Sequence, residues 1–172
     1  MIRESFLDLL KEREASKITV TEICTRAEIN RATFYRYYDN PLALLDAIEA
    51  ELLDGLQEKI RRLPAAEPSA IFRSILEDIL ARREIYLTLF SENGDAMFKQ
   101  RVFEQCYPEN METIRTRFPG LAQDKQQWFY YFIAEGCTGI LNRWLSGGMR
   151  EPPEEIVGFL TALIDALNRA AL

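Results

Sequence analysis

Apolar residues recur along the chain at the three- and four-residue spacing that is typical of amphipathic α-helices. The first stripe, close to the N-terminus, comprises Ile2, Phe6, Leu9 and Leu10. A longer stripe predicts a helix over about residues 41–63 and comprises Leu42, Leu45, Ile48, Leu52, Leu56 and Ile60. Between these two stripes lie shorter apolar groups that are separated by polar residues, which indicates short helices.

The segment PAAEPS at 64–69 is the clearest boundary by composition, and further helical stripes follow it. They predict helices over about residues 71–79, 84–90, 95–107, 108–118, 123–145 and 153–167. The stretch 123–145 is apolar almost all round, so we expect other helices to cover most of its sides. Since strand-like alternation never exceeds a few residues, the predicted class is all-α, with about nine helices.

Capping signals define two short helices near the N-terminus. The stretch Thr19-Val20-Thr21-Glu22 has the form of a capping box, which predicts a helix over about 20–27. Asn30 is a favoured N-cap for a second helix over about 30–38, and Asn40 is another before Pro41. Two short helices with so tight a connection have the proportions of a helix-turn-helix.

The charge of the chain is unevenly distributed. The 172 residues carry a net charge of −6. Between residues 17 and 38, four basic residues against two acidic ones give +2, which leaves −8 for the rest. The predicted helix-turn-helix is therefore locally basic, whereas the body of the chain is acidic, and the local excess favours nucleic-acid binding by that segment alone.

Several classes of chemistry find no support in the composition. The chain has no histidine, no Gly-rich phosphate loop and no CxxC pair, and its three cysteines are Cys24, Cys106 and Cys137. We expect these cysteines to be small buried hydrophobic residues, and we predict neither a metal site nor a cofactor nor an enzyme. Because the apolar runs are too short to span a bilayer and the N-terminus is not a secretion signal, we also expect no membrane association.

The second short helix concentrates side chains that suit DNA. If Phe34 and Tyr37 face inward at helical spacing, Arg31, Thr33 and Arg36 lie on other sides of the helix. Arginine reads guanine bidentately, and hydroxyl groups donate hydrogen bonds to phosphate. The alternative is a helix-turn-helix that serves only for packing.

The segment ITVTEICTRAEINRATFYRYYDNPLALLDAI, residues 18–48, resembles the DNA-binding head of the tetracycline-repressor (TetR) family of bacterial transcription regulators. The matching motifs are TVTEIC at 19–24, ATFY at 32–35 and YRYY at 35–38. The segment ATFYRYY, together with GILNRWLSGGMREPPEEI in the C-terminal half, resembles sequences of the branch that includes dihydroxyacetone-kinase regulators. The resemblance implies a three-helix head joined to a C-terminal effector and dimerisation domain.

The predicted DNA-binding residues are Lys17, Thr19, Arg31, Thr33, Tyr35, Arg36, Tyr37 and Tyr38. By the resemblance, Thr19, Thr33 and Tyr35 would contact phosphate, and Arg31, Arg36 and Tyr37 would face or flank the major groove. Two departures from the family pattern affect the head. Glu28 stands where the turn usually has glycine, and it requires either an unfavourable backbone angle or a shifted turn. Pro41 stands where the family usually has a phosphate-contacting lysine, so non-specific DNA affinity should be weaker.

The resemblance places the head at residues 1–45 and the body at 46–172, joined by the helix 41–63. The predicted dimer interface comprises Phe132, Ile140, Trp144, Ile156, Phe159, Leu160, Leu163 and Leu167. An effector pocket between the body helices would be lined by Phe72, Phe90, Met97, Phe98, Phe103, Tyr107 and Trp128, although core packing explains each of them equally well. A ligand for such a pocket should be largely apolar or aromatic.

These features predict a homodimeric, cytoplasmic bacterial regulator, nucleoid-associated when bound to DNA. It would act as a repressor that binds a palindromic operator in double-stranded DNA and is modulated by an effector. The alternative is a regulator-like interaction module, controlled by a protein partner, whose DNA binding is weak or lost. An apolar cavity in the body favours the effector, whereas a filled core with an exposed apolar patch favours the partner.

Overall fold

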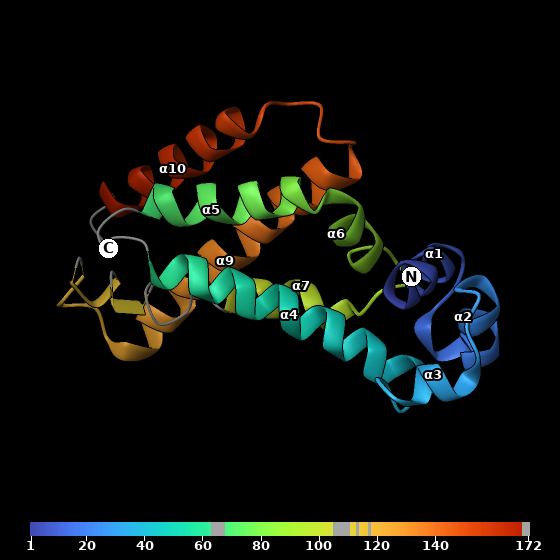
Figure 1. Ribbon diagram of the computed structural model, residues 1–172. Coiled ribbons are helices and arrows are strands. Elements are labelled where there is room, and N and C mark those ends of the chain that lie inside the picture. Colours follow the sequence, from blue (N-terminus) through green and yellow to red (C-terminus); the bar gives the residue numbers. More distant parts are fainter. Residues whose placement is uncertain (63–67, 105–110, 113, 117, 170–172) are drawn as a thin grey trace. The chain divides into compact units, whose positions relative to one another are not determined.

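The computed structural model describes residues 1–62, 68–104, 111–112, 114–116 and 118–169, without the side chains of 68–72, 96, 99, 103, 168 and 169 (Figure 1). The regular secondary structure of the described residues consists of helices and holds no strand, which confirms the predicted class. It divides into two compact units, one formed by residues 1–55 and 82–99 and the other by 56–81 and 100–172. The functional division at residue 45 stays a prediction.

The first unit contains the predicted head. Its elements are α1 (Ile2–Glu12), a 3-10 turn (Ala15–Lys17), α2 (Val20–Arg26), α3 (Arg31–Tyr35), most of α4 (Pro41–Arg61), α6 (Arg83–Leu89) and the start of α7 (Ala96–Glu104). Helix α1 packs against α2 and α6, and α2 packs against α3. This arrangement buries Phe6 of α1, Ile23 of α2 and Phe34 of α3 completely.

The predicted caps begin the helices of the head. The Thr19 hydroxyl accepts from the Glu22 amide at 3.3 Å, and the Glu22 carboxylate accepts from the Thr19 amide at 2.9 Å, so the capping box is confirmed. The Asn30 side chain accepts from the Thr33 amide at 2.8 Å, and the Asn40 side chain accepts from the Ala43 amide at 2.9 Å. Local polar residues therefore determine where α2, α3 and α4 begin.

Helix α2 ends in a Schellman motif centred on Glu28. The Ile29 amide donates to the Cys24 carbonyl at 3.0 Å, and the Glu28 amide donates to the Thr25 carbonyl at 3.3 Å. This closure places Glu28 at φ 54°, in the left-handed region that favours glycine. Of the two outcomes expected for a glutamate here, the unfavourable backbone angle is the one observed.

An aromatic cluster completes the core of the first unit. The ring of Tyr86 lies 5.6 Å from that of Phe90 and 6.3 Å from that of Phe98, and the last two rings are 5.7 Å apart. All three side chains are buried. The cluster gives α6 and the start of α7 a common apolar contact within this unit.

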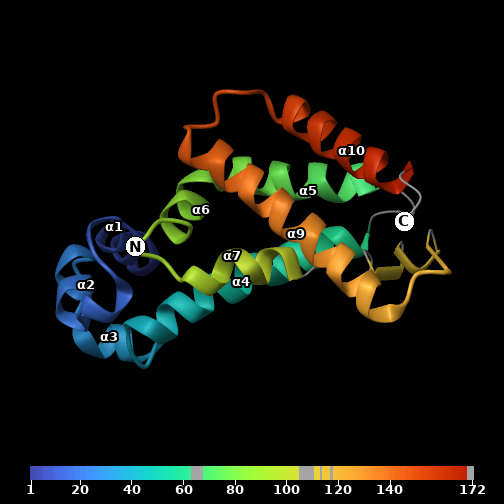
Figure 2. The same cartoon turned by 180° about the vertical axis from the view of Figure 1, so that it is seen from behind.

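The second unit contains α5 (Pro68–Ala81), α9 (Gln123–Ser146) and α10 (Pro153–Arg169), together with the C-terminal parts of α4 and α7. Helices α5 and α10 lie side by side in both views (Figures 1 and 2). The Trp144 indole N–H donates to the Glu151 carbonyl at 2.9 Å, which ties the end of α9 to the loop before α10. On the buried side of α5, Asp78 forms an ion pair with Lys59 of α4.

An apolar cluster in the second unit comprises Met111, Ile114, Phe129 and Tyr130.

Cys24 and Cys137 are buried free cysteines, as predicted, whereas Cys106 lies outside the described residues. Among the helices of the described residues, none is both long enough and apolar enough to cross a bilayer.

Candidate nucleic-acid interface

Helix α3 displays most of its predicted DNA contacts to solvent while one ring anchors it. Phe34 is fully buried, and the centroid of its ring lies 5.7 Å from that of Tyr35 and 5.9 Å from that of Tyr38. Arg31, Tyr35 and Arg36 are exposed, and Thr33 is half-buried. The anchored helix can therefore present guanidinium groups and a phenol to a ligand without disturbing the core.

The prediction that Tyr37 faces inward is wrong. Its side chain is 63% exposed. The phasing assumed a regular helix to Tyr38, but α3 ends at Tyr35 and the Tyr37 amide donates to the Phe34 carbonyl at 3.0 Å, a three-residue spacing. Because the chain leaves the 3.6-residue period there, Tyr37 turns toward solvent. The resemblance, which gave Tyr37 a role near the groove, is compatible with this position.

Carboxylates neutralise several basic side chains of the head but not the two arginines at α3. Lys17 pairs with Glu14 at 3.0 Å, and Arg26 pairs with Glu12 at 3.0 Å. Among the described residues, no carboxylate lies within ion-pair distance of Arg31 or Arg36. Arg31 donates only to the neutral hydroxyl of Thr21. The positive charge at α3 is thus left for an anionic ligand.

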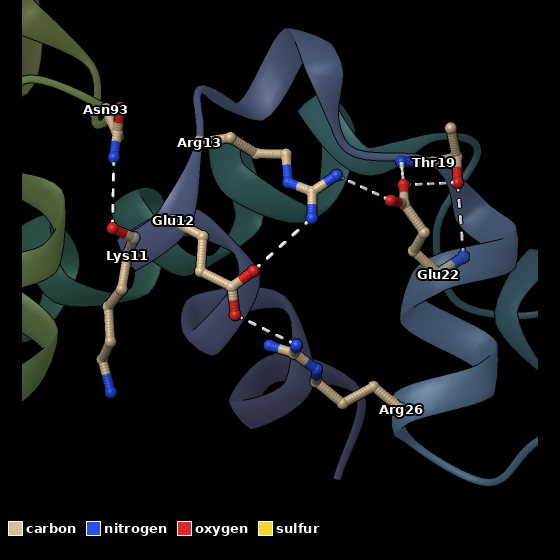
Figure 3. A network of polar contacts seen from close by, with 7 residues as sticks. All are labelled: Lys11, Glu12, Arg13, Thr19, Glu22, Arg26 and Asn93. Carbon is tan, nitrogen blue, oxygen red and sulfur yellow. Dashed lines mark hydrogen bonds and ion pairs between the residues drawn. The ribbon is translucent and has the colours of Figure 1, made fainter.

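A polar network joins α1 to α2 beside the predicted interface (Figure 3). The Arg13 guanidinium donates to Glu22 at 2.8 Å and to Glu12 at 3.4 Å. Hydrogen bonds from the Thr19 hydroxyl and amide hold the pKa of the Glu22 carboxyl below its usual value, and Arg13 adds to this effect. Arg13 is a residue of this site that no sequence pattern indicates, because its role depends on a partner in another helix.

A second network positions Tyr38. The Arg3 guanidinium donates to the Tyr38 hydroxyl at 3.2 Å and forms an ion pair with Glu51 of α4. These contacts connect Arg3 of α1 with Tyr38, which follows α3, and with Glu51 of α4, which are 35 and 48 residues further along the chain. The pKa of Arg3 is raised, first by Tyr38 and then by Glu51, so the guanidinium stays charged.

The residues predicted to line an effector pocket lie in different places. Phe90 and Phe98 fill the aromatic core of the first unit. Met97 of the first unit and Trp128 of the second are exposed. Tyr107 lies outside the described residues, as do the side chains of Phe72 and Phe103. The pocket stays a prediction.

The predicted dimer residues fall into two groups. Trp144, Ile156 and Leu160 are buried within the chain itself, so they already pack in the core of the second unit. Phe132, Phe159 and Leu163 are exposed, while Ile140 and Leu167 are half-buried. The interface prediction therefore depends mainly on the exposed group.

Comparison with known proteins places these observations in a family. A TetR-type family model, described as the C-terminal region of transcriptional regulators, matches residues 66–166, more than half of the chain. A curated relative is the uncharacterized HTH-type transcriptional regulator YxbF of Bacillus subtilis (strain 168), which is 31% identical over 55 residues. That match covers 32% of this chain and 14% of the relative, so the chain spans only a small part of its length.

Two solved structures share the fold. One, from Pseudomonas aeruginosa PAO1, is described as a transcriptional regulator; it aligns with a TM-score of 0.65 at 20% identity, over 99% of this chain and 89% of its own. The other is the fatty acid degradation regulator FadR from Bacillus halodurans. It aligns with a TM-score of 0.67 at 12% identity, over 99% of this chain and 98% of its own. At these identities the similarity shows a common fold alone.

Proposed function

We propose that this chain, a member of the TetR family of transcriptional regulators, is a homodimeric repressor that binds a palindromic operator. The observation that supports this most directly is the pair of exposed arginines, Arg31 and Arg36, without a carboxylate partner among the described residues. DNA supplies phosphates that such charges would neutralise and base edges that guanidinium groups can read.

In this proposal the contacts divide by chemistry. Thr19, Thr33 and Tyr35 donate to phosphates, and Lys17 exchanges its exposed Glu14 partner for a phosphate. The groove-facing or flanking residues are Arg31, Arg36 and Tyr37, with Tyr38 beside them. Because a proline stands at the start of α4 where the resemblance expects lysine, sequence-blind affinity should be modest.

The test of operator binding is a selection of bound duplexes from a random pool at moderate salt. The wild type is compared with Arg31→Ala and with Arg73→Ala, which removes an exposed arginine from α5 in the other unit. The proposal expects a palindrome from the wild type and the control, and loss of part of its consensus with Arg31→Ala. Recovery of no common sequence from any of the three would refute operator binding.

The dimer is proposed from the exposed apolar residues of α9 and α10, and Phe159 and Leu163 of α10 are 53% and 41% exposed. Helix α9 also presents an exposed face of its own. Trp128 and Phe132 are 65% and 66% exposed, and the same face continues through Gly136 and Gly139, where an added Cβ would meet no atom within 4 Å. Large rings thus lie on one side of Ala134 and open glycines on the other. Two antiparallel α9 helices related by a two-fold axis near Ala134 would place Phe132 against Gly136 of the partner subunit.

Sedimentation of the full chain tests this interface. Phe132→Asp puts a charge on the shared face and should shift the protein to monomer, because a buried unpaired carboxylate opposes association. Leu42→Asp is the matched control, since Leu42 is also an exposed apolar residue but lies on α4 in the other unit. A wild type that sediments as a monomer at high concentration would contradict the proposal.

Release from the operator is proposed to follow binding of an effector, either a small apolar molecule or a protein. The exposed aromatic residues of α9 would serve a protein partner if they do not serve a second copy of the chain. Assignment to the dihydroxyacetone-kinase-regulator branch is part of the same proposal and depends on the segments 32–38 and 139–156. By linkage, an effector that favours wrongly spaced heads lowers operator affinity.

A further inference from the structure

A cavity of about 590 Å³ lies in the first unit, among α1, the residues around α3, α4 and α6. This volume is within the range of small-molecule sites. Apolar side chains from four separate segments form most of its wall, namely Ile2, Leu7, Ile29, Ile48, Leu52 and Ile85. It is distinct from the pocket expected between the body helices, since none of the residues predicted to line that pocket lines this cavity.

One part of the lining is polar and contains an exchangeable ion pair. Arg3 and Glu51 both line the cavity, and their side chains are 44% and 61% exposed. An ion pair so accessible to water contributes little to stability, so Glu51 can move into solvent at small cost. If another carboxylate then takes its place on Arg3, the guanidinium keeps an anionic partner.

We propose that this cavity binds an amphipathic monocarboxylate. The ligand carboxylate replaces that of Glu51 on the Arg3 guanidinium and also accepts from the Tyr38 hydroxyl, while the apolar chain covers the isoleucine and leucine wall. Guanidinium provides the donors that suit a carboxylate, and the apolar wall accounts for the rest of the binding free energy.

The position of the cavity gives the ligand a consequence for DNA. Thr33, Tyr37 and Tyr38 line it and are also proposed DNA contacts. A ligand held against them competes with the operator for these side chains, so ligand and operator each weaken the other's binding. This consequence rests on the proposed function, whereas binding of the ligand does not.

Calorimetric titration of the full chain with decanoate, below its micellar concentration, tests the site. Arg3→Gln should weaken binding at least about fivefold, because it removes the charged donor. Glu51→Gln should strengthen binding several-fold, because it removes the competing carboxylate. Arg73→Gln, the control in the second unit, should leave the affinity unchanged. A purely structural role for the Arg3–Glu51 pair would instead weaken binding in both variants of the pair.

Two further measurements distinguish binding in the cavity from adsorption elsewhere on the protein surface. Leu7→Trp fills part of the cavity and should abolish decanoate binding while the variant still unfolds cooperatively. Decanol, which lacks the charge, should bind more weakly than decanoate. The proposal is overturned if decanoate does not bind, or if its affinity is the same in wild type, Arg3→Gln and Leu7→Trp. If decanoate binds through Arg3 but the protein selects no operator, the site stands and the repressor proposal fails.

Discussion

Glu28 occupies a backbone conformation that glycine adopts more easily, so Glu28→Gly should stabilise the protein. Its φ of 54° follows from the Schellman closure of α2, in which the amides of Glu28 and Ile29 both bond back to the helix. The same closure ends α9, where the corresponding position is Gly148 with φ 85°. The chain thus uses glycine at one of two equivalent positions and glutamate at the other.

The size of the effect follows from two opposing contributions. A left-handed conformation costs an L-residue about 1–2 kcal/mol. Glycine loses more conformational entropy on folding than other residues do, and this loss offsets about 0.5–1 kcal/mol of the stabilisation. We therefore expect Glu28→Gly to raise the free energy of unfolding by about 0.5–1 kcal/mol. For a chain of this length, 1 kcal/mol corresponds to about 2–4 °C in Tm.

Urea titrations followed by far-UV circular dichroism measure this change. Glu28→Ala removes the charge and keeps Cβ, so glycine should exceed alanine in stability at position 28 by about 1 kcal/mol. Thr25, an exposed residue inside α2, provides the matched comparison. There alanine should exceed glycine by about 1 kcal/mol, because the backbone is helical.

The difference in stability between the glycine and alanine variants is expected to have opposite signs at positions 28 and 25. This contrast separates the effect of the backbone angle from the effect of the side chain. If alanine is more stable than glycine at position 28 as well, Glu28 is not strained and the turn differs from the Schellman geometry. If glycine and alanine both stabilise equally at that position, charge rather than φ accounts for the cost of glutamate.

Three other predictions follow from local chemistry. Thr19→Ala removes the N-cap of α2 and should lower the free energy of unfolding by about 1 kcal/mol in urea titrations; an unchanged value would show that water replaces the cap. Because hydrogen bonds from Thr19 lower the pKa of Glu22, the stabilisation relative to Glu22→Gln is complete above about pH 5 and disappears as pH falls through the lowered value. A pH series of titrations checks this, and a difference that grows in acid would contradict it. Burial raises the pKa of the Cys137 thiol to about 12, so mass spectrometry should find slow iodoacetamide labelling in the native protein and fast labelling in urea; equal rates would show an accessible thiol.

Local signals in the sequence were sufficient for the helical class and for the beginnings of the head helices. Thr19, Asn30 and Asn40 cap helices because each needs only an amide two or three residues away. The family, too, was recognisable from motifs within continuous segments. Such predictions succeed because their physical causes lie within one turn of helix.

Features that depend on tertiary structure were not predictable in this way. Helical spacing predicts that Tyr37 faces inward only if the helix is regular to Tyr38, whereas three-residue hydrogen bonding ends α3 early. The Arg3–Tyr38–Glu51 contacts join residues that no spacing rule connects. Likewise, apolarity around α9 predicted that it is covered, but only the structure shows that Trp128 and Phe132 remain exposed within one chain.

Sequence-specific DNA binding by the head is the central claim, and one titration tests it most directly. Wild type and Arg31→Ala are titrated with the selected palindrome and with a scrambled duplex over a range of salt concentrations. The account predicts that the wild type prefers the palindrome, and that Arg31→Ala loses about 1–3 kcal/mol of that preference while still binding the scrambled duplex. Equal, salt-sensitive binding of both duplexes by both proteins would contradict the claim, because it would mean that the head contacts phosphates without reading bases.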